Sequence, residues 1–161
     1  MADSGKKSTE RRDPLAGFCF KVTFTDVKDI VGSAVVETYF RSVSGLRAEN
    51  EVVPLRAGGV NDTVFNLVGG VKWAPLVFKQ GFTKDSALLK WREMWTQQGE
   101  KRRSGGTIVQ LDSTLTVAQA EWTFVRGWPS KWELTEFDAS KSELSIETLE
   151  ICHEGLKYSP K

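Results

Sequence analysis

The chain has 161 residues, of which 40% are hydrophobic and 27% charged, a composition typical of one globular domain that buries its core without metals or disulfides. Its 22 basic and 21 acidic side chains leave a formal charge of +1, which argues against a dedicated nucleic-acid binder. So little net charge also suits a protein that associates with copies of itself.

Residues 1–13 are polar and charged, and they lack the apolar stretch of a signal peptide. We expect a flexible N-terminal arm over 1–13 and a single β domain over 14–161. No segment approaches the ~20 apolar residues of a membrane-spanning helix, so we expect no membrane anchor. Cys19 and Cys152 lie in segments of apolar periodicity, and we expect two free thiols and not a disulfide.

The first half of the domain predicts extended segments. Phe18, Phe20, Val22 and Phe24 alternate with other residues at the period of a half-buried strand. A second strand is expected over Val35–Val43, which is rich in β-branched and aromatic residues.

Gly45 is expected to end that second strand and to lead towards a long loop at 54–62 with paired glycines. Strands are then predicted at Val64–Val68 and Val71–Phe82, separated by Gly69 and Gly70. Pro75 would place the second of them at a sheet edge or beside a bulge.

One helix is predicted, over Asp85–Gln98. Leu88, Trp91 and Trp95 form one apolar stripe at helical spacing. Thr83 or Asp85 would cap its start, and Gly99 suits the position just past its end.

The last third again predicts strands, and Pro129 is expected to end the second of them. Apolar residues change faces between Leu144 and Ile151, which indicates a bulge or burial on both sides. The expected strands are Thr107–Leu111, Ala120–Trp128, Trp132–Phe137 and Glu143–Ile151. The predicted fold class is therefore mainly β, a sandwich or barrel with one flanking helix.

Residues that carry chemistry are scarce. His153 is the only histidine, and in a strand its neighbours Cys152 and Glu154 would project to the opposite face. The Gly58-Gly59 and Gly69-Gly70 pairs lack the Lys-Ser/Thr ending of a phosphate-binding loop. We therefore expect no catalytic residue, no metal site and no cofactor, and we interpret His153 as a structural or interface residue.

Several phrases occur in an order that resembles the tail-tube family of contractile phages and phage-tail-like contractile injection systems. The resemblance spans residues 13–157. Its phrases are Asp13-Pro14-Leu15, Phe18-x-Phe20-x-Val22, Val43-Ser44-Gly45-Leu46, Glu49-x-Glu51, the stretch from Arg56 to Asp62, Gln80-Gly81-Phe82-Thr83, Trp128-Pro129-x-Lys131-Trp132, and the stretch from Glu147 to Leu156.

The resemblance implies a barrel-like sandwich with a flanking helix, six copies of which join their sheets into a ring. Rings would stack into an inner tube inside a contractile sheath, built on a baseplate, with DNA or toxin cargo only in its lumen. It also implies a structural protein without enzymatic activity, made in the bacterial cytoplasm and assembled into a phage tail or phage-like particle.

By the same resemblance, the stretches Val43–Leu46 and Glu49–Asp62 correspond to regions that touch adjacent subunits or rings. The expected contact residues are Val43, Ser44, Gly45, Leu46, Glu49, Glu51, Arg56, Gly58, Gly59, Asn61 and Asp62. The family's closing motif corresponds to His153, Glu154, Gly155 and Leu156. The sequence departs from the family pattern at Leu67-Val68-Gly69-Gly70, where relatives often have a Leu-Pro-Gly turn, and at Gln80-Gly81, where Arg-Gly is common.

Three alternatives remain open. The resemblance implies that a tube initiator next to the baseplate shares the same fold, and sequence does not separate it from the main tube subunit. A small β-barrel carrier would need an apolar cavity, which the many bulky aromatic residues disfavour. An enzyme built around His153, Cys152 or Glu154 is the least favoured.

Overall fold

A computed structural model describes residues 19–25, 35–56, 58, 64–82, 87–97, 101–135 and 145–160. The expected N-terminal arm at 1–13 lies outside these residues. The elements are β1 Cys19–Thr25, β2 Val35–Phe40, β3 Ser42–Ser44, β4 Ala48–Leu55, β5 Phe65–Trp73, β6 Leu76–Gly81, α2 Ala87–Thr96, β7 Ser104–Leu111, β8 Ala118–Leu134, β9 Ile146–Cys152 and β10 Gly155–Pro160.

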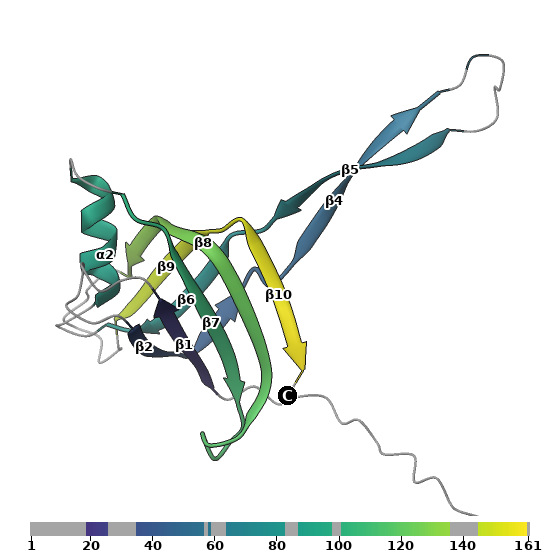
Figure 1. Ribbon diagram of the computed structural model, residues 1–161. Helices are drawn as coiled ribbons and strands as arrows, with labels where there is room; N and C mark the ends of the chain where they lie inside the picture. Colours follow the sequence, from purple (N-terminus) through teal and green to yellow (C-terminus); the bar gives the residue numbers. More distant parts are fainter. Residues whose placement is uncertain are drawn as a thin grey trace, which may run out of the picture.

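Two antiparallel sheets share the long strand β8 and curve around one core (Figure 1). The first sheet has the order β2-β1-β7-β8-β10, and in it β7 and β10 pair with the N-terminal half of β8. The second sheet has the order β8-β9-β6-β3, and in it β9 pairs with the C-terminal half of β8. Strands β4 and β5 pair only with each other among the described residues and project from this barrel. The predicted class, a β-rich barrel-like sandwich with a helix, is confirmed.

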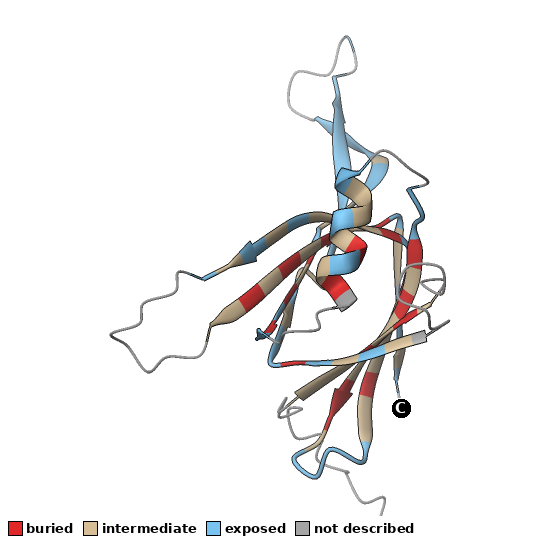
Figure 2. Cartoon of the chain, turned by 90° about the vertical axis from the view of Figure 1, so that its left-hand side faces the viewer, coloured by how far each residue is buried: buried red, intermediate tan, exposed pale blue. Residues whose placement is uncertain are grey.

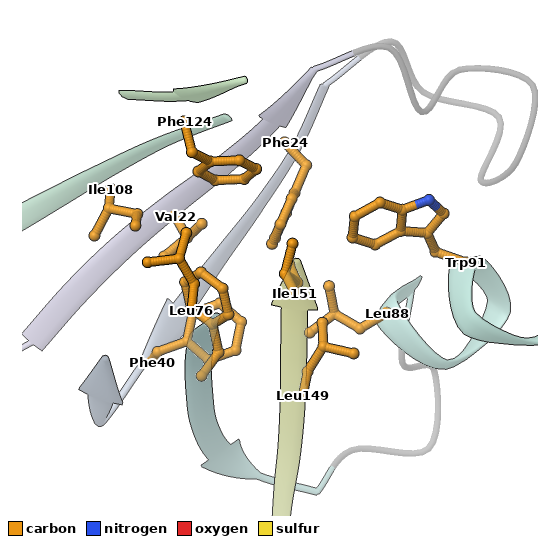
Figure 3. Packing of buried hydrophobic residues seen from close by; sticks show 11 residues of the cluster. Val22, Phe24, Phe40, Leu76, Leu88, Trp91, Ile108, Phe124, Leu149 and Ile151 are labelled. Atoms are coloured by element: carbon orange, nitrogen blue, oxygen red, sulfur yellow. The ribbon is translucent and has the colours of Figure 1, made fainter. Parts of the chain in front are cut away.

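The core is built from the inward faces of both sheets and from α2 (Figure 3). Phe24 lies at its centre, with ring centroids 6.1 Å from Phe78, 5.5 Å from Trp91 and 6.0 Å from Phe124. The tilted and edge-on geometries are those that aromatic pairs prefer. The alternation of β1 predicted from the sequence is confirmed, since Val22 and Phe24 are buried whereas their strand neighbours are not.

The helix keeps its predicted apolar stripe. Leu88 and Trp91 are buried, Leu88 lies beside Leu149 in Figure 3, and Trp95 stacks on Trp128 of β8 with centroids 5.4 Å apart. The proposed capping residues Thr83 and Asp85, and Gly99 beyond the end, lie outside the described residues.

The single strand predicted over Val35–Val43 is wrong, because the chain changes sheets at Arg41. Strand β2 pairs with β1 in the first sheet, whereas β3 pairs with β6 in the second. The backbone N–H of Arg41 donates to the carbonyl oxygen of Lys79 on β6 at 2.9 Å. This hydrogen bond holds the chain where it passes from the first sheet to the second. Alternation alone does not reveal such a corner, since both segments remain extended.

The prediction that Pro129 ends a strand is also wrong. Pro129 is buried within β8, next to a register shift in the pairing of β8 with β9. At such a bulge the strand does not require a backbone N–H from the proline. Just before it, Arg126 has φ 54°, and a Cβ on Gly127 would lie 2.8 Å from the Phe124 ring. This bend lets one strand serve both sheets.

The ends of β9 also differ from the prediction. Strand β9 begins at Ile146, whereas the predicted start at Glu143 lies outside the described residues, and β10 was not predicted. Strand β9 alternates between buried and half-buried residues, pairs with β6 in continuous register, and pairs with β8 across a register shift between Pro129 and Lys131. Both explanations for the apolar change of face therefore stay predictions. Leu144 lies outside the described residues.

Candidate assembly interface

The largest exposed feature is the projecting hairpin, formed by β4 and β5 (Ala48–Leu55 and Phe65–Trp73). The sequence predicted that a loop begins at Pro54 and that strands are separated at Gly69-Gly70, whereas β4 continues to Leu55 and β5 runs through both glycines. The two strands are paired along their whole length except at a single bulge. Figure 2 shows the hairpin as an almost wholly exposed extension of the barrel.

The bulge lies in the middle of the hairpin. Asn50 pairs with Val71 and Val52 with Val68, so Glu51 faces two residues, Gly69 and Gly70. A Cβ on Gly69 would lie 2.8 Å from the carbonyl oxygen of Glu51, so the close approach requires glycine. The departure from the Leu-Pro-Gly pattern noted in the sequence is therefore a bulge within a strand and not a turn.

We call Val52–Leu55 with Phe65–Val68 the outer half of the hairpin, and the part nearer the barrel its inner half. The inner half is mostly polar and carries an exposed ion pair between Lys72 and Glu51, 3.6 Å apart. The outer half is mostly apolar, and its large side chains are 45% to 84% exposed. The expected contact stretch Glu49–Asp62 includes Val52–Leu55, whereas Phe65–Val68 was not predicted as a contact region. Two apolar runs flanking a glycine-bearing loop are a hairpin signal that could have found them.

The base of the hairpin is held by His153, whose Nε2 lies 3.0 Å from the carbonyl oxygen of Ala74. Its Nδ1 lies 3.1 Å from the carbonyl oxygen of Gly155, at the start of β10. The ring also packs against Trp73, the last residue of β5, with centroids 5.8 Å apart. The histidine therefore ties the hairpin to the junction of β9 and β10.

The other residues of the closing motif also act on this junction. Glu154 accepts hydrogen bonds from Arg103 and from Arg126 Nε, the latter at 2.5 Å, and its backbone N–H donates to Val125 O at 3.1 Å. This ion-paired cluster stabilises the positive-φ bend at Arg126. Gly155 begins β10, and Leu156 packs against the core.

Among the described residues predicted to make subunit contacts, those of the stretch Val43–Leu46 lie on the barrel and at the base of the hairpin. Val43 and Leu46 pack against the core of their own chain. Ser44 and Gly45 line a hollow of about 370 Å³ at the base of the hairpin, together with Arg47, Pro75 and Glu150.

The other described residues predicted as contacts lie on β4 or shortly after it. Glu49, Glu51 and Arg56 are exposed along β4 and just after it, and Gly58 is exposed in a turn. Gly59, Asn61 and Asp62 lie outside the described residues.

Two strands lie at the edges of the first sheet. Within the described residues β2 pairs only with β1, and β10 pairs only with β8. Tyr39 on β2 is 54% exposed and Tyr158 on β10 is 53% exposed. Lys21 forms an ion pair with Glu37 across β1 and β2 at 2.8 Å, and this hydrogen bond raises the pKa of Lys21. An open strand edge is a template for pairing with another chain.

The groups considered for catalysis are engaged in holding the fold. Both ring nitrogens of His153 face carbonyl oxygens, and the Glu154 carboxylate is bound by two arginines. Glu147 is buried and accepts hydrogen bonds from Gln80 Nε2 at 2.8 Å and Trp132 Nε1 at 2.7 Å. Across the part of the chain that the structure describes, no three His, Cys, Asp or Glu residues gather as a metal site. No helix there is long and apolar enough to cross a membrane.

A family model described as "T4-like virus tail tube protein gp19" matches residues 16–157 of the chain. The chain belongs to this tail tube family. The match includes the barrel, the projecting hairpin and the closing motif, and it confirms the family resemblance seen in the sequence. Comparison with curated proteins finds no match.

Solved structures share the tail tube fold. A chain of the anti-feeding prophage (AFP) baseplate, 6-fold symmetrised, is similar with a TM-score of 0.80 and 23% identity, over 92% of this chain and 97% of that one. A chain of the extracellular contractile injection system PVC, in its sheath–tube complex in the extended state, has a TM-score of 0.76 and 18% identity, over 99% and 100%. Hcp1 from Flavobacterium johnsoniae has a TM-score of 0.51 and 14% identity, over 89% and 97%.

Proposed function

We propose that this chain is a structural subunit of the inner tube of a contractile phage tail or contractile injection system, and that it acts by self-association without catalysis. The observation that carries the proposal is the apolar hairpin that projects from a barrel with open sheet edges, in a member of the tail tube family. Exposed apolar patches of this kind mark sites of protein–protein interaction.

Six copies would form a ring by pairing their open edges. A strand edge leaves a row of backbone N–H and C=O groups unpaired. In a closed ring of identical subunits, these groups form hydrogen bonds with the strand edge of the neighbouring subunit. The similarity to a chain of a baseplate that is 6-fold symmetrised supports six as the number. The projecting hairpin would then join one ring to the next, because it extends beyond the barrel.

Stacked rings would enclose a lumen for DNA or toxin cargo and would carry a sheath outside. The similarity to a chain from a sheath–tube complex supports a sheath partner, and that to a baseplate chain supports a baseplate partner. The particle would assemble after synthesis in the bacterial cytoplasm. Nothing in this role requires a cofactor or a catalytic group.

Negative-stain electron microscopy and native mass spectrometry of the purified protein test the proposal. We expect hexameric rings about 10 nm across, the size given by six domains of this length, and stacks of such rings at high concentration. A protein that stays monomeric at high concentration would refute it.

Surface variants refine this test. Substituting Val43 or Leu46 by Asp would disturb the barrel itself, since both pack against the core. Ser44 is exposed at the hollow, so Ser44→Asp introduces a charge without removing core packing. If this predicted contact is correct, Ser44→Asp lowers assembly while the thermal unfolding of the barrel stays unchanged.

A second candidate is the tube initiator next to the baseplate, which the similarity to an AFP baseplate chain favours. Structures described as an AFP tube-terminating cap and a PVC sheath/tube terminator are also similar, so the fold serves several positions in such machines. An initiator would form single rings that do not stack on themselves. A main tube subunit would extend into tubes under the same conditions.

A further inference from the structure

The projecting hairpin meets the barrel at Arg47, just before β4, and at Ala74, just after β5. The backbone N–H of Ala74 donates to the carbonyl oxygen of Arg47 at 3.3 Å, which closes the base of the hairpin. The carbonyl oxygen of Ala74 lies 3.0 Å from Nε2 of His153, which comes from the junction of β9 and β10. Ala74 therefore joins the two ends of the hairpin to each other and to the histidine.

Both ring nitrogens of His153 face hydrogen-bond acceptors. Its Nδ1 lies 3.1 Å from the carbonyl oxygen of Gly155, and a carbonyl oxygen has no proton to donate. A neutral imidazole carries one N–H, so it can donate to one of the two carbonyl groups and turns a bare lone pair towards the other. The doubly protonated ring has an N–H for each. The geometry therefore fits the imidazolium form and makes one contact of the neutral form repulsive.

The surroundings of the ring offset the cost of burying its charge. His153 is 9% exposed, and burial by itself disfavours the charged form of a histidine. Hydrogen bonds donated by a charged group are roughly twice as strong as neutral ones, and here both go to carbonyl oxygens. The ring also lies 5.8 Å from the ring of Trp73, centroid to centroid, a distance at which an aromatic face attracts a cation.

The charged side chains around this junction have other partners or line the hollow at the hairpin base. Glu154 is bound by two arginines, and Lys72 forms an ion pair with a glutamate of the hairpin. Arg47 and Glu150, which carry opposite charges, line the hollow together with Ala74. The titratable groups that the surrounding elements bring to the junction are Arg47, Glu51, Lys72, Arg103, Arg126, Glu150, Cys152, Glu154 and Lys157.

We propose that a doubly protonated His153 anchors the projecting hairpin to the barrel, and that this anchor is sensitive to pH. One N–H of the ring holds Ala74 at the hairpin base, and the other holds Gly155 at the start of β10. Because β10 is an open edge of the first sheet, the anchor fixes the hairpin relative to that edge.

The sign of the pH dependence follows from the ring. In acid the ring carries both protons and makes both hydrogen bonds. As the pH rises and one proton leaves, one of these bonds is lost and the hairpin base opens more often. The inference goes beyond the proposed function and does not depend on it, because it concerns contacts within one chain.

The protonation of the ring can be observed directly, since His153 is the one histidine of the chain. Nitrogen NMR of the unmodified chain with isotope-labelled histidine distinguishes an N–H from a bare ring nitrogen. We expect two N–H groups at about pH 7, where an unperturbed histidine, with a pKa of about 6.5, is mostly neutral. A bare ring nitrogen on most molecules at that pH would overturn the inference.

Hydrogen exchange measures the anchor itself. After correction for the intrinsic effect of pH, the protection of the Ala74 N–H should fall about tenfold between acid and alkaline pH, as expected for the loss of one hydrogen bond. The N–H of Ile108, in the core of the first sheet, is the internal reference and should keep its protection. Equal behaviour of the two N–H groups in the unmodified chain would overturn the inference.

Two variants assign the pH dependence to the histidine. His153→Gln has no proton to lose in this range, so the protection of Ala74 should no longer change with pH. Lys157→Gln removes an exposed charge from β10 and is the matched control, which should respond to pH like the unmodified chain. A pH response that persists in His153→Gln would overturn the inference. If His153→Gln does not fold, the two measurements on the unmodified chain still decide. Failure to form rings would refute the tube function and leave these results unaffected.

Discussion

The barrel and the projecting hairpin use the same kinds of side chain in opposite ways. In the barrel, Phe24 and Phe78 are buried against residues of their own chain. In the hairpin, Phe65 and Leu67 are each 49% exposed. The barrel therefore has its stabilising contacts within one molecule, whereas the large apolar side chains of the outer half of the hairpin remain exposed. If the proposed assembly uses the hairpin, substitutions in the two regions should affect different measurements, stability in the barrel and assembly in the hairpin.

The largest difference is expected between two phenylalanines. Phe24→Ala removes the ring that contacts Phe78, Trp91 and Phe124, so the free energy of unfolding should fall by about 3–5 kcal/mol. Phe65→Ala should change it by less than about 0.5 kcal/mol, because no packed core contact is lost, and should lower assembly instead. Urea denaturation followed by tryptophan fluorescence measures the first effect, and sedimentation velocity the second. Equal losses of stability would show that the hairpin belongs to the folding unit.

Two glycines give the next comparison. Gly45 has φ 86°, and a Cβ there would lie 1.9 Å from the carbonyl oxygen of Pro75. Gly45→Ala should therefore cost about 2–4 kcal/mol through backbone strain and displacement of that carbonyl.

Gly70 in the hairpin is the matched control, since a Cβ there meets nothing within 4 Å. Gly70→Ala should leave the unfolding midpoint of the barrel unchanged. A tolerated Gly45→Ala would mean that the junction between β3 and the hairpin base is less rigid than the structure indicates.

A smaller effect is expected at the buried Glu147. Its carboxylate accepts hydrogen bonds from Gln80 and Trp132, whereas a glutamine would turn an NH₂ donor towards one of these donors. Glu147→Gln should lower the free energy of unfolding by about 1–3 kcal/mol. Glu133→Gln, at an exposed site on β8, is the matched control and should change stability little, even though it removes an ion pair with Lys131. Denaturant titration of both variants checks the difference.

The smallest effect concerns pH and the turn between β7 and β8. Asp112 accepts hydrogen bonds from Thr114 Oγ1 and from the backbone N–H groups of Thr116 and Val117, which lower the pKa of its carboxyl, chiefly through Thr114. A lowered folded-state pKa stabilises the fold above the ordinary aspartate pKa, about 3.9, and this stabilisation is lost as the pH falls through the folded-state value. Asp112→Asn should therefore be less stable than the unmodified chain at neutral pH, with a gap that closes in acid. A gap that is constant with pH would contradict this assignment.

Much of the barrel could be predicted from the sequence because its signals are local. Val22 and Phe24 on β1, and Leu88 and Trp91 on α2, repeat at the periods of a strand and a helix, and those periods hold wherever the elements pack. The closing motif could be identified from the sequence, but the contacts that its residues make could not be predicted. The contacts of His153 with Ala74, and of Glu154 with Arg103, join residues more than 50 positions apart, which no local pattern encodes.

The sequence by itself determined the family, the β-rich class, the helix and the scarcity of residues suited to catalysis. Tertiary structure alone decided the change of sheet at Arg41, the passage of β8 through Pro129 and the projection of the hairpin from the barrel. These features depend on which strand lies opposite each residue. A proline is accepted where the strand pairing has a register shift, and apolar strands stay exposed where none of the described residues of the chain covers them.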